Sequence, residues 1–371
     1  MIPCTNIFRG LRTIHTERKR GPLFAWNITA RCNLRCSHCY RDSRTVEGPG
    51  NDGRDLSDEK CIQLIDEIKR LDPPMVLLTG GEPLLRKNVF DIVKKCKASG
   101  LRIALSTNGT LIDRVMAQKI ETNGVDYVGI SIDGRDALHD EFRGLEGASG
   151  LSWDAIKYLN SLGVKTGVRF TLTDKTKGDL FHVLDRTVEA GTKRFCLYHL
   201  VYSGRGMGVA DISPREKREI MTEFFSRVKA LSLTDDEFEV LTTDNHADGV
   251  YMLQSLADDE AAYSCIKAHG GCSAGDRVIY LDSTGDVYPC QFLREESLGN
   301  VIERSLVDIW EDEKNPLLKK LRNKENFLQG RCGECAYKNV CGGCRARARA
   351  RSGSLWDEDP ACYLEEKEIL V

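Results

Sequence analysis

The chain has 371 residues, of which 41% are hydrophobic and 29% charged, proportions that are normal for a soluble globular protein. Its formal net charge of -3 gives no reason to expect a polyanionic partner such as nucleic acid, and no apolar run approaches the roughly 18 residues that span a bilayer. No apolar stretch follows the basic residues near the N-terminus, so we expect no signal peptide and predict a cytoplasmic protein.

Short apolar runs alternate with longer periodic segments between residues 23 and 208. Strands are predicted at 24–29, 75–78, 102–106, 127–132, 164–172 and 195–200. Helices are predicted at 58–71, 89–97, 112–121, around 153–161 and 180–190. Repeated strand–helix units indicate a parallel sheet with helices outside it. The predicted fold is therefore α/β, a partial (β/α)6 barrel of the TIM type that is two units short of closure.

The alternation stops after Gly208. A long helix is predicted at 214–231, a mixed region at 241–270, a hairpin turning near 283–285 and a short helix at 306–312. We predict an N-terminal extension (1–22), the partial barrel (23–208), a helical connection and substrate region (209–262) and a C-terminal cysteine-rich domain (263–371).

Cysteine is frequent, with 15 in the chain. The cytosol keeps thiols reduced, so clustered cysteines are expected to be metal ligands rather than disulfide partners. Three lie between residues 32 and 39, and eight lie between 265 and 362. The remaining four, Cys4, Cys61, Cys96 and Cys196, are predicted to be buried and inert.

The first cysteine group, Cys32, Cys36 and Cys39, directly follows the first predicted strand. Loops after the strands of a parallel barrel form its active-site face. Three thiolates suit a 4Fe–4S cluster with one open iron, whereas a structural zinc ion needs a fourth ligand, which His38 can in principle supply. Polar, glycine-rich segments end the next three strands, at Gly80-Gly81-Glu82-Pro83, 106–109 and 131–134. Together these segments predict a small-molecule site on one face.

With these motifs the chain resembles the radical S-adenosylmethionine (SAM) superfamily, over nearly its full length. In that family a reduced cluster cleaves SAM, and the resulting 5′-deoxyadenosyl radical abstracts a substrate hydrogen. The resemblance implies that residues 80–82 contact the SAM amino group. It also implies that Ser131 and Arg143 hold the ribose and carboxylate, with Tyr40 beside the adenine. A reducing electron donor such as ferredoxin or flavodoxin is implied as well; no catalytic acid or base is identified.

The eight C-terminal cysteines resemble the SPASM extension, which carries auxiliary 4Fe–4S clusters. The resemblance implies one or two such clusters. It assigns one set to Cys265, Cys272, Cys290 and Cys344, and the other to Cys332, Cys335, Cys341 and Cys362. The chain departs from the family spacing between Cys341 and Cys344, where two residues stand instead of three. The alternative is a zinc ribbon formed by the four cysteines at 332–344.

Residues 167–173, 197–206, 244–249 and 358–364 resemble a subgroup that trims carboxylate side chains of iron tetrapyrroles in d1-type haem synthesis and in the siroheme-dependent route to haem. An iron tetrapyrrole is therefore the expected substrate. Arg169 and Arg205 can pair with its carboxylates, and His199 or His246 can approach its iron, although a structural role stays open for both histidines.

One alternative remains for the chain's function. The chain can be a SPASM maturase that modifies a peptide or protein, or that matures another cofactor such as that of a tungsten oxidoreductase. Four further arginines are expected to form a solvated basic surface: Arg345, Arg347, Arg349 and Arg351.

Overall fold

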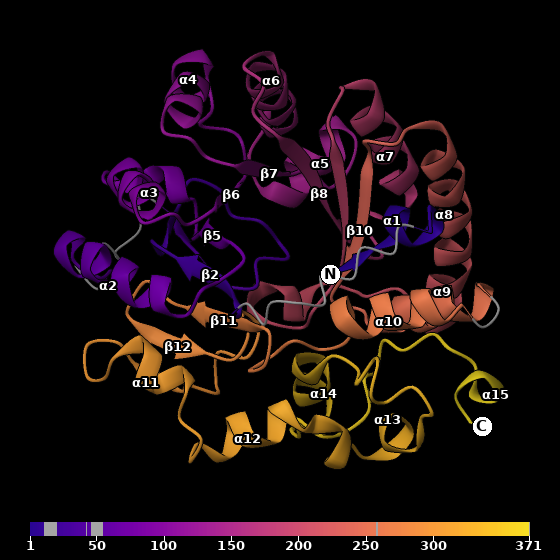
Figure 1. The fold of residues 1–371 in the computed structure, drawn as a ribbon. Coiled ribbons are helices and arrows are strands. Elements are labelled where there is room, and N and C mark those ends of the chain that lie inside the picture. Colours follow the sequence, from indigo (N-terminus) through magenta and orange to yellow (C-terminus); the bar gives the residue numbers. More distant parts are fainter. Residues whose placement is uncertain (11–20, 42, 46–54, 257–258, 371) are drawn as a thin grey trace.

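A computed structural model describes residues 1–10, 21–41, 43–45, 55–256 and 259–370 (Figure 1). Within these ranges the main sheet has eleven strands in the order β1-β10-β9-β8-β7-β6-β5-β2-β11-β12-β13. All neighbours from β10 to β11 are parallel. In sheet order, these strands are β10 (Glu239–Thr243), β9 (Arg194–His199), β8 (Thr166–Leu172), β7 (Tyr127–Ser131), β6 (Ile103–Thr107), β5 (Val76–Thr79), β2 (Leu23–Asn27) and β11 (Val278–Leu281).

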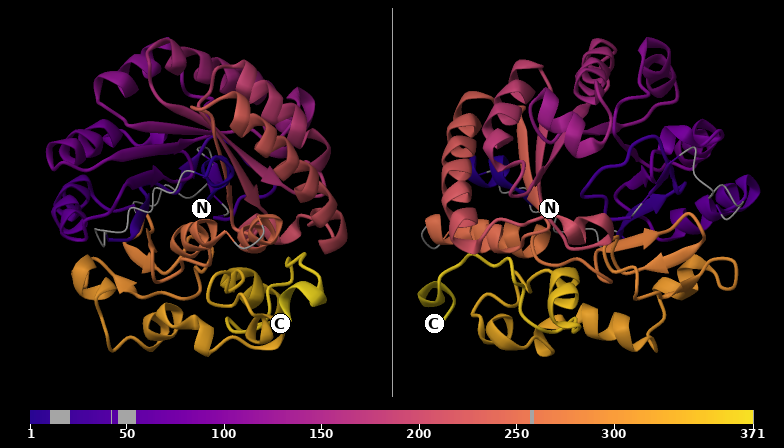
Figure 2. Two further views of the ribbon diagram at one scale, coloured as in Figure 1. Left: turned by 45° about the vertical axis from the view of Figure 1, so that its right-hand side comes forward. Right: turned by 180° about the vertical axis from the view of Figure 1, so that it is seen from behind.

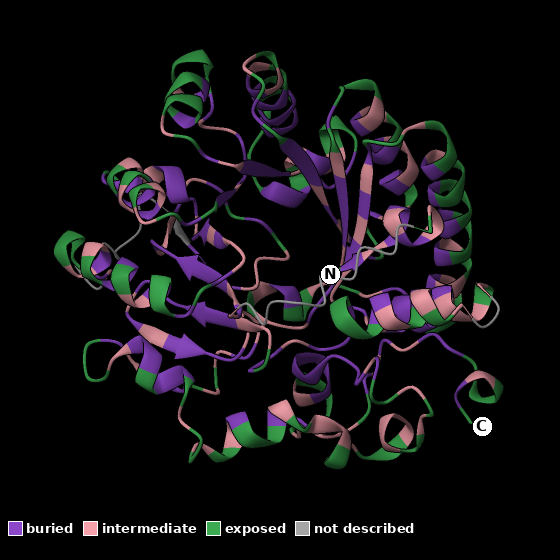
Figure 3. Cartoon of the chain, viewed as in Figure 1, coloured by how far each residue is buried: buried purple, intermediate pink, exposed green. Residues whose placement is uncertain are grey.

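Helices lie outside the strands in an arc, with their buried faces toward the sheet (Figures 1, 2 and 3). They are α2 (Asp58–Arg70), α3 (Val89–Ala98), α4 (Arg114–Thr122), α5 (Asp136–Arg143), α6 (Ala148–Ser161), α7 (Leu180–Glu189) and α8 (Pro214–Thr234). In α2 the apolar residues at helical spacing, Leu64, Ile65 and Ile68, are the buried ones. Ser57 caps this helix by accepting a hydrogen bond from the Lys60 amide.

The partial barrel predicted from the sequence is confirmed, and its sheet is longer than the six predicted strands. β10 continues it beyond β9, and β11, the first strand of the predicted hairpin, pairs in parallel with β2. The barrel stays open, because β1 (Ile2–Pro3) pairs with β10 and β12 (Asp286–Tyr288) pairs with β11. Only Val240 and Thr242 are buried in β10, so this strand carries a weak apolar pattern.

The C-terminal part lies against the open side of the barrel (Figures 1 and 2, orange and yellow). It contains β13 (Gly299–Asn300), α11 (Leu306–Trp310), α12 (Pro316–Arg322), α13 (Gly330–Glu334), α14 (Arg345–Ser352) and α15 (Glu366–Ile369). Within the mixed region, α9 (Ala247–Ser255) and α10 (Glu260–His269) precede it. The three predicted domain boundaries stay predictions, and the sheet itself continues across those at 208 and 262.

Two further observations concern the isolated cysteines and the length of the apolar helices. Cys4, Cys61, Cys96 and Cys196 are all buried, as predicted. Among the residues described, no helix is long and apolar enough to cross a bilayer.

Glycine on the inner face of the barrel makes room for large polar side chains. A Cβ atom on Gly167 of β8 would overlap Tyr127 Oη, and one on Gly129 of β7 would overlap the guanidinium of Arg169. Tyr127 is further fixed by Arg194, whose guanidinium carbon lies 4.7 Å from the ring centroid. Tyr127 and Arg169 can therefore extend into the interior, where both line a central cavity.

Gly167→Ala should destabilise the protein by about 1–3 kcal/mol, because the rigid Tyr127 ring must move to admit the new methyl group. Urea unfolding measures the change. Gly150→Ala is the matched control, since its Cβ meets nothing within 4 Å and helix α6 should gain about 0.5–1 kcal/mol. Equal stability of Gly167→Ala and wild type would contradict this packing.

Candidate active site

A cavity of about 600 Å³ lies inside the barrel and brings together residues from both cysteine groups. From the first motif and the strand ends it is lined by Cys32, Cys36, Cys39, Tyr40, Gly80, Gly81, Ser131 and Arg143. From the C-terminal part it is lined by Cys272, Cys290 and Cys344, which we call the inner set. The Tyr40 ring meets Phe292 of the C-terminal part edge-on, with centroids 5.6 Å apart. Segments far apart in the sequence thus face one space.

Each sulfur of the first group has a polar neighbour. The Leu34 amide donates to Cys32 Sγ (3.4 Å), Arg143 Nη1 donates to Cys36 Sγ (3.7 Å), and Cys39 Sγ lies 3.5 Å from Ser43 Oγ. Hydrogen bonds and positive charge near sulfur stabilise the thiolate, which is the form that binds iron. The surroundings of these three thiols therefore suit a 4Fe–4S cluster.

The pKa values of the three thiols differ. Burial raises the pKa of Cys32 to about 12 and also raises that of Cys36. For Cys39, burial acts in the same direction, but hydrogen bonds from Ser43 and Arg41 and the charge of Arg205 hold its pKa below the ordinary value. Cluster binding must therefore overcome the burial that keeps Cys32 and Cys36 protonated.

Residues 31–41, the cluster loop, are held by elements from both parts of the chain. The Arg205 amide donates to the Cys39 carbonyl (2.9 Å), and Arg205 Nε donates to the Cys36 carbonyl (2.8 Å). Gly204 has φ +55°, and a Cβ there would lie 2.5 Å from the Cys39 carbonyl oxygen. From the other side, Arg41 forms a buried ion pair with Asp282 in the β11–β12 turn. Arg205 lines the cavity, yet its guanidinium also fixes the loop backbone.

The Gly-Gly-Glu-Pro segment lies against the cluster loop. The Glu82 amide donates to the Arg31 carbonyl (2.7 Å), and a Cβ on Gly81 would overlap that carbonyl oxygen. The Glu82 carboxylate is fully buried and accepts from Leu84 N (3.1 Å), Thr107 Oγ1 (2.9 Å) and Asn108 N (2.9 Å). Burial raises the pKa of Glu82 to about 7. The two glycines line the cavity, while the Glu82 side chain ties their loop to the end of β6.

Arg143 and His38 lie beside Cys36 in a buried polar group. Arg143 forms an ion pair with the fully buried Asp133. His38 stacks on Phe142 with ring centroids 4.3 Å apart, and its Nε2 lies 3.8 Å from Asp133 Oδ2. Burial, aided by the Arg143 charge, lowers the pKa of His38 to about 3. His38 is therefore neutral at physiological pH.

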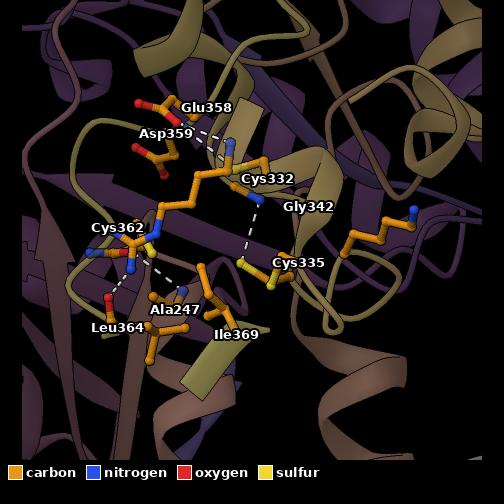
Figure 4. Close-up of a pocket in the computed structure, with 14 residues that line it drawn as sticks. Ala247, Cys332, Cys335, Gly342, Glu358, Asp359, Cys362, Leu364 and Ile369 are labelled. Carbon is orange, nitrogen blue, oxygen red and sulfur yellow. Dashed lines mark hydrogen bonds between the residues drawn. The ribbon is translucent and has the colours of Figure 1, made fainter. Parts of the chain in front are cut away.

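The cysteines Cys332, Cys335, Cys341 and Cys362, which we call the outer set, line a second, small cavity of about 20 Å³ (Figure 4). Backbone amides point at three of the sulfurs, each at 3.4 Å: Asp359 N at Cys332, Tyr337 N at Cys335 and Gly343 N at Cys341. Such amide–sulfur hydrogen bonds are a feature of iron–sulfur sites. The structure thus brings together all four cysteines that the SPASM resemblance groups in one set.

Cys265, which the resemblance groups with the inner set, is the member of that group that does not line the cavity. It lies on α10, with its sulfur 3.8 Å from His269 Nδ1, and it lines neither cavity. In the described part of the chain, no three His, Cys, Asp or Glu side chains converge as a single metal ion requires.

The expectation that Arg345 and Arg347 belong to a solvated surface is wrong, because both are fully buried in α14. Arg347 pairs with Asp359, and Arg345 donates to the carbonyls of Leu355 and Asp357. These acceptors follow the helix in the chain and compensate the buried charge, which the local run of arginines does not reveal.

The two candidate histidines occupy different environments. The His199 ring is completely buried, and its Nε2 lies 2.9 Å from Asp248 Oδ2, whose other oxygen accepts from the Tyr363 hydroxyl (2.7 Å). Both histidines line the cavity, but His246 is partly exposed there. Arg169 also lines the cavity and donates to Ser106 Oγ. Accessibility therefore favours His246 over His199 as a substrate contact.

Asp244, absent from the predicted site, also lines the cavity. It adopts the left-handed backbone region (φ 70°), and its buried Oδ2 has no hydrogen-bond partner among the described residues. Burial raises the pKa of Asp244 to about 6. It directly follows β10, so recognition of that strand would have placed it with the other polar residues at strand ends.

Comparison with known proteins identifies two matching families and several full-length relatives. The radical SAM superfamily matches residues 26–186, and the SPASM iron–sulfur cluster-binding domain matches residues 272–344. The chain is 36% identical to Fe-coproporphyrin III synthase of Methanosarcina barkeri, over 95% of this chain and 90% of the relative. It is 37% identical to pre-heme d1 synthase of Dinoroseobacter shibae, over 94% and 87% respectively.

Solved structures share the fold at lower identity. Streptococcus suis SuiB bound to S-adenosylmethionine matches with a TM-score of 0.73 and 17% identity, over 93% of this chain and 78% of SuiB. The anSMEcpe structure with bound AdoMet matches with a TM-score of 0.69 and 21% identity, over 92% and 94% respectively.

Cys32→Ala should abolish formation of 5′-deoxyadenosine from SAM while leaving iron in the C-terminal part, because Cys32 lies apart from the outer set. Chromatography of the reduced, anaerobic protein with SAM measures the first effect, and iron and sulfide counts measure the second. Cys61→Ala, which removes a buried thiol outside both cysteine groups, should retain both properties. Continued SAM cleavage by Cys32→Ala would rule out this cysteine as a cluster ligand.

Proposed function

The chain belongs to the radical SAM superfamily and carries a SPASM extension, and on this basis we propose that it removes carboxylate side chains from an iron tetrapyrrole. It is an enzyme whose cofactors are SAM, a 4Fe–4S cluster and auxiliary iron–sulfur clusters. When reduced, the cluster supplies the electron that cleaves SAM into a radical able to abstract a substrate hydrogen. The residues of this chain bind, orient and shield the reactants.

The charge of the cavity is the observation that carries the proposal. Among the described residues that line it, Asp244 is the one acid and five are arginines. The arginines are Arg143, Arg169, Arg194, Arg205 and Arg277. Such a wall attracts a substrate that carries several carboxylates. An uncharged or cationic peptide would gain nothing from it.

Arg169 is the arginine best placed to meet a substrate carboxylate. Arg143, Arg194 and Arg277 already pair with Asp133, Glu239 and Asp276. The Arg169 guanidinium instead meets neutral hydroxyl groups in the barrel wall, those of Ser106 and Tyr127. A guanidinium can bind a carboxylate with two parallel hydrogen bonds. We therefore assign Arg169 to a propionate or acetate side chain of the substrate.

Apolar residues form much of the remaining wall, which suits the flat, apolar macrocycle of a tetrapyrrole. They include Leu23, Leu77, Leu200, Val201, Phe292 and Leu293. His246 also lines the cavity and is partly exposed, and a neutral imidazole is a common axial ligand of haem iron. Burial lowers the pKa of His246, which keeps it in that neutral form.

The relatives support the same substrate class. The two at 36% and 37% identity are named for the products Fe-coproporphyrin III and pre-heme d1. A mycofactocin maturase of Mycobacterium tuberculosis is also similar, at 29% identity over 92% of this chain and 83% of that protein. It keeps peptide modification as the alternative to be tested.

An anaerobic assay with a panel of iron tetrapyrroles tests the proposal. With reductant and SAM, a tetrapyrrole that bears acetate or propionate groups should lose mass as 5′-deoxyadenosine accumulates in step. Metal-free porphyrins with the same side chains are the control for the iron. If SAM is cleaved but only a peptide changes mass, the tetrapyrrole assignment is wrong.

His246→Ala should alter the Soret band of a bound iron tetrapyrrole, because it removes the proposed axial ligand. His269→Ala is the matched control: this histidine also lines the cavity but is exposed and bonded to the Cys265 carbonyl (3.0 Å). Identical bound spectra for wild type and His246→Ala would eliminate His246 as the ligand.

A further inference from the structure

We propose that Arg345, Arg347 and Asp359 couple the inner and outer cysteine sets, with Arg345 tuning the cluster of the outer set and Asp359 joining the two. The inference rests on the cluster assignments and not on the identity of the substrate. It concerns positioning residues that act on the clusters through their cysteine ligands.

Arg345 reaches the outer set directly. Its Nη2 donates to Cys332 Sγ at 3.7 Å, while Nη1 donates to the carbonyls of Leu355 (2.8 Å) and Asp357 (2.7 Å). The side chain is fully buried. No carboxylate within the described ranges pairs with it, so its positive charge is not neutralised by a counter-ion. Cys332 therefore has a buried cation as its hydrogen-bond donor.

The glycine before Cys344 leaves room for this contact. Gly343, in this short loop, has φ +56°, and a Cβ there would lie 2.6 Å from Arg345 Nη2 and 3.0 Å from Cys332 Sγ. Any larger residue would separate the guanidinium from the sulfur. The departure from the family spacing thus coincides with a gap that Arg345 fills.

Asp359 touches one cysteine of each set. Its amide donates to Cys332 Sγ (3.4 Å), and its Oδ2 accepts from the Cys344 amide (2.7 Å). Arg347 holds the carboxylate with two hydrogen bonds of 2.8 Å and donates through Nη1 to the Leu200 carbonyl (3.1 Å) in the cavity wall. Through its amide and its carboxylate, Asp359 therefore connects the outer set, the inner set and, by way of Arg347, the barrel.

Charge and hydrogen bonds at the sulfurs set the reduction potential of an iron–sulfur cluster. A cation beside Cys332 stabilises the reduced, more negative state and raises the potential of the outer cluster. The Asp359 carboxylate acts in the opposite direction on both clusters, since it lies beside a ligand of each. Removing the charge of Arg345 and removing that of Asp359 should therefore shift the reduction potential of the outer cluster in opposite directions.

Anaerobic redox titration followed by electron paramagnetic resonance tests this coupling in the full-length, reconstituted protein without substrate. Arg345→Met should shift the midpoint of the outer cluster to a more negative value and leave the other signals in place. Arg345→Lys, which retains the charge, should give a smaller shift. Arg351→Met is the matched control, because this arginine is exposed at the end of the same helix. Cys335→Ala identifies the outer signal by its loss.

Asp359→Asn should shift both the inner and the outer signal to more positive values, because it removes a negative charge near Cys332 and Cys344. Iron and sulfide counts on every variant separate a changed potential from a lost cluster. If Arg345→Met loses iron, Arg345→Lys replaces it in the test. A shifted outer midpoint in that variant supports the proposal, and an unchanged midpoint contradicts it. Fully loaded variants with unchanged midpoints would overturn the proposal, as would an equal shift in Arg351→Met. A negative tetrapyrrole assay would leave these results unaffected.

Discussion

An open parallel sheet has two edges that need partners, and the way in which this chain covers them determines where its chemistry lies. A strand edge carries unpaired amide and carbonyl groups, which other backbone must satisfy. One edge is paired by β1, and the other by the β11–β12 hairpin. Because the hairpin leads directly to Cys290, covering the second edge also brings the inner set to the cavity.

The same hairpin positions the cluster loop. Asp282, in its turn, pairs with Arg41 and also with Arg294 Nη2 (2.8 Å), whose Nη1 donates to the Arg41 carbonyl (3.1 Å). The loop after β9 holds the backbone at Cys36 and Cys39 through hydrogen bonds from Arg205, with Gly204 packed against it. The hairpin turn, Arg294 and the loop after β9 therefore together fix the geometry of Cys32, Cys36 and Cys39. A buried ion pair adds little net stability, but it defines one arrangement of the groups that it joins.

Features with a local pattern could be predicted from the sequence. The period of Leu64, Ile65 and Ile68 identified α2, and motifs at successive strand ends fell on one face because parallel strands share a direction. Features that depend on distant partners could not be predicted. β10 has too few buried residues to stand out, and only Asp359 explains why Arg347 is buried. The resemblance groups Cys265 with Cys272, Cys290 and Cys344, and only those three line the cavity, so this part of the assignment stays a prediction.

The pairing of β2 with β11 also governs the order in which the molecule can be assembled. Arg41 and Asp282 are separated by 241 residues, so the first three cysteines leave the ribosome long before the residues that hold the C-terminal end of their loop. Contacts of such long sequence separation form late, because the intervening chain must first be ordered. The cluster loop therefore reaches its final geometry only after synthesis of the C-terminal part. Truncating the C-terminal part would remove Asp282 and Arg294, and with them the contacts that hold Arg41 at the end of this loop.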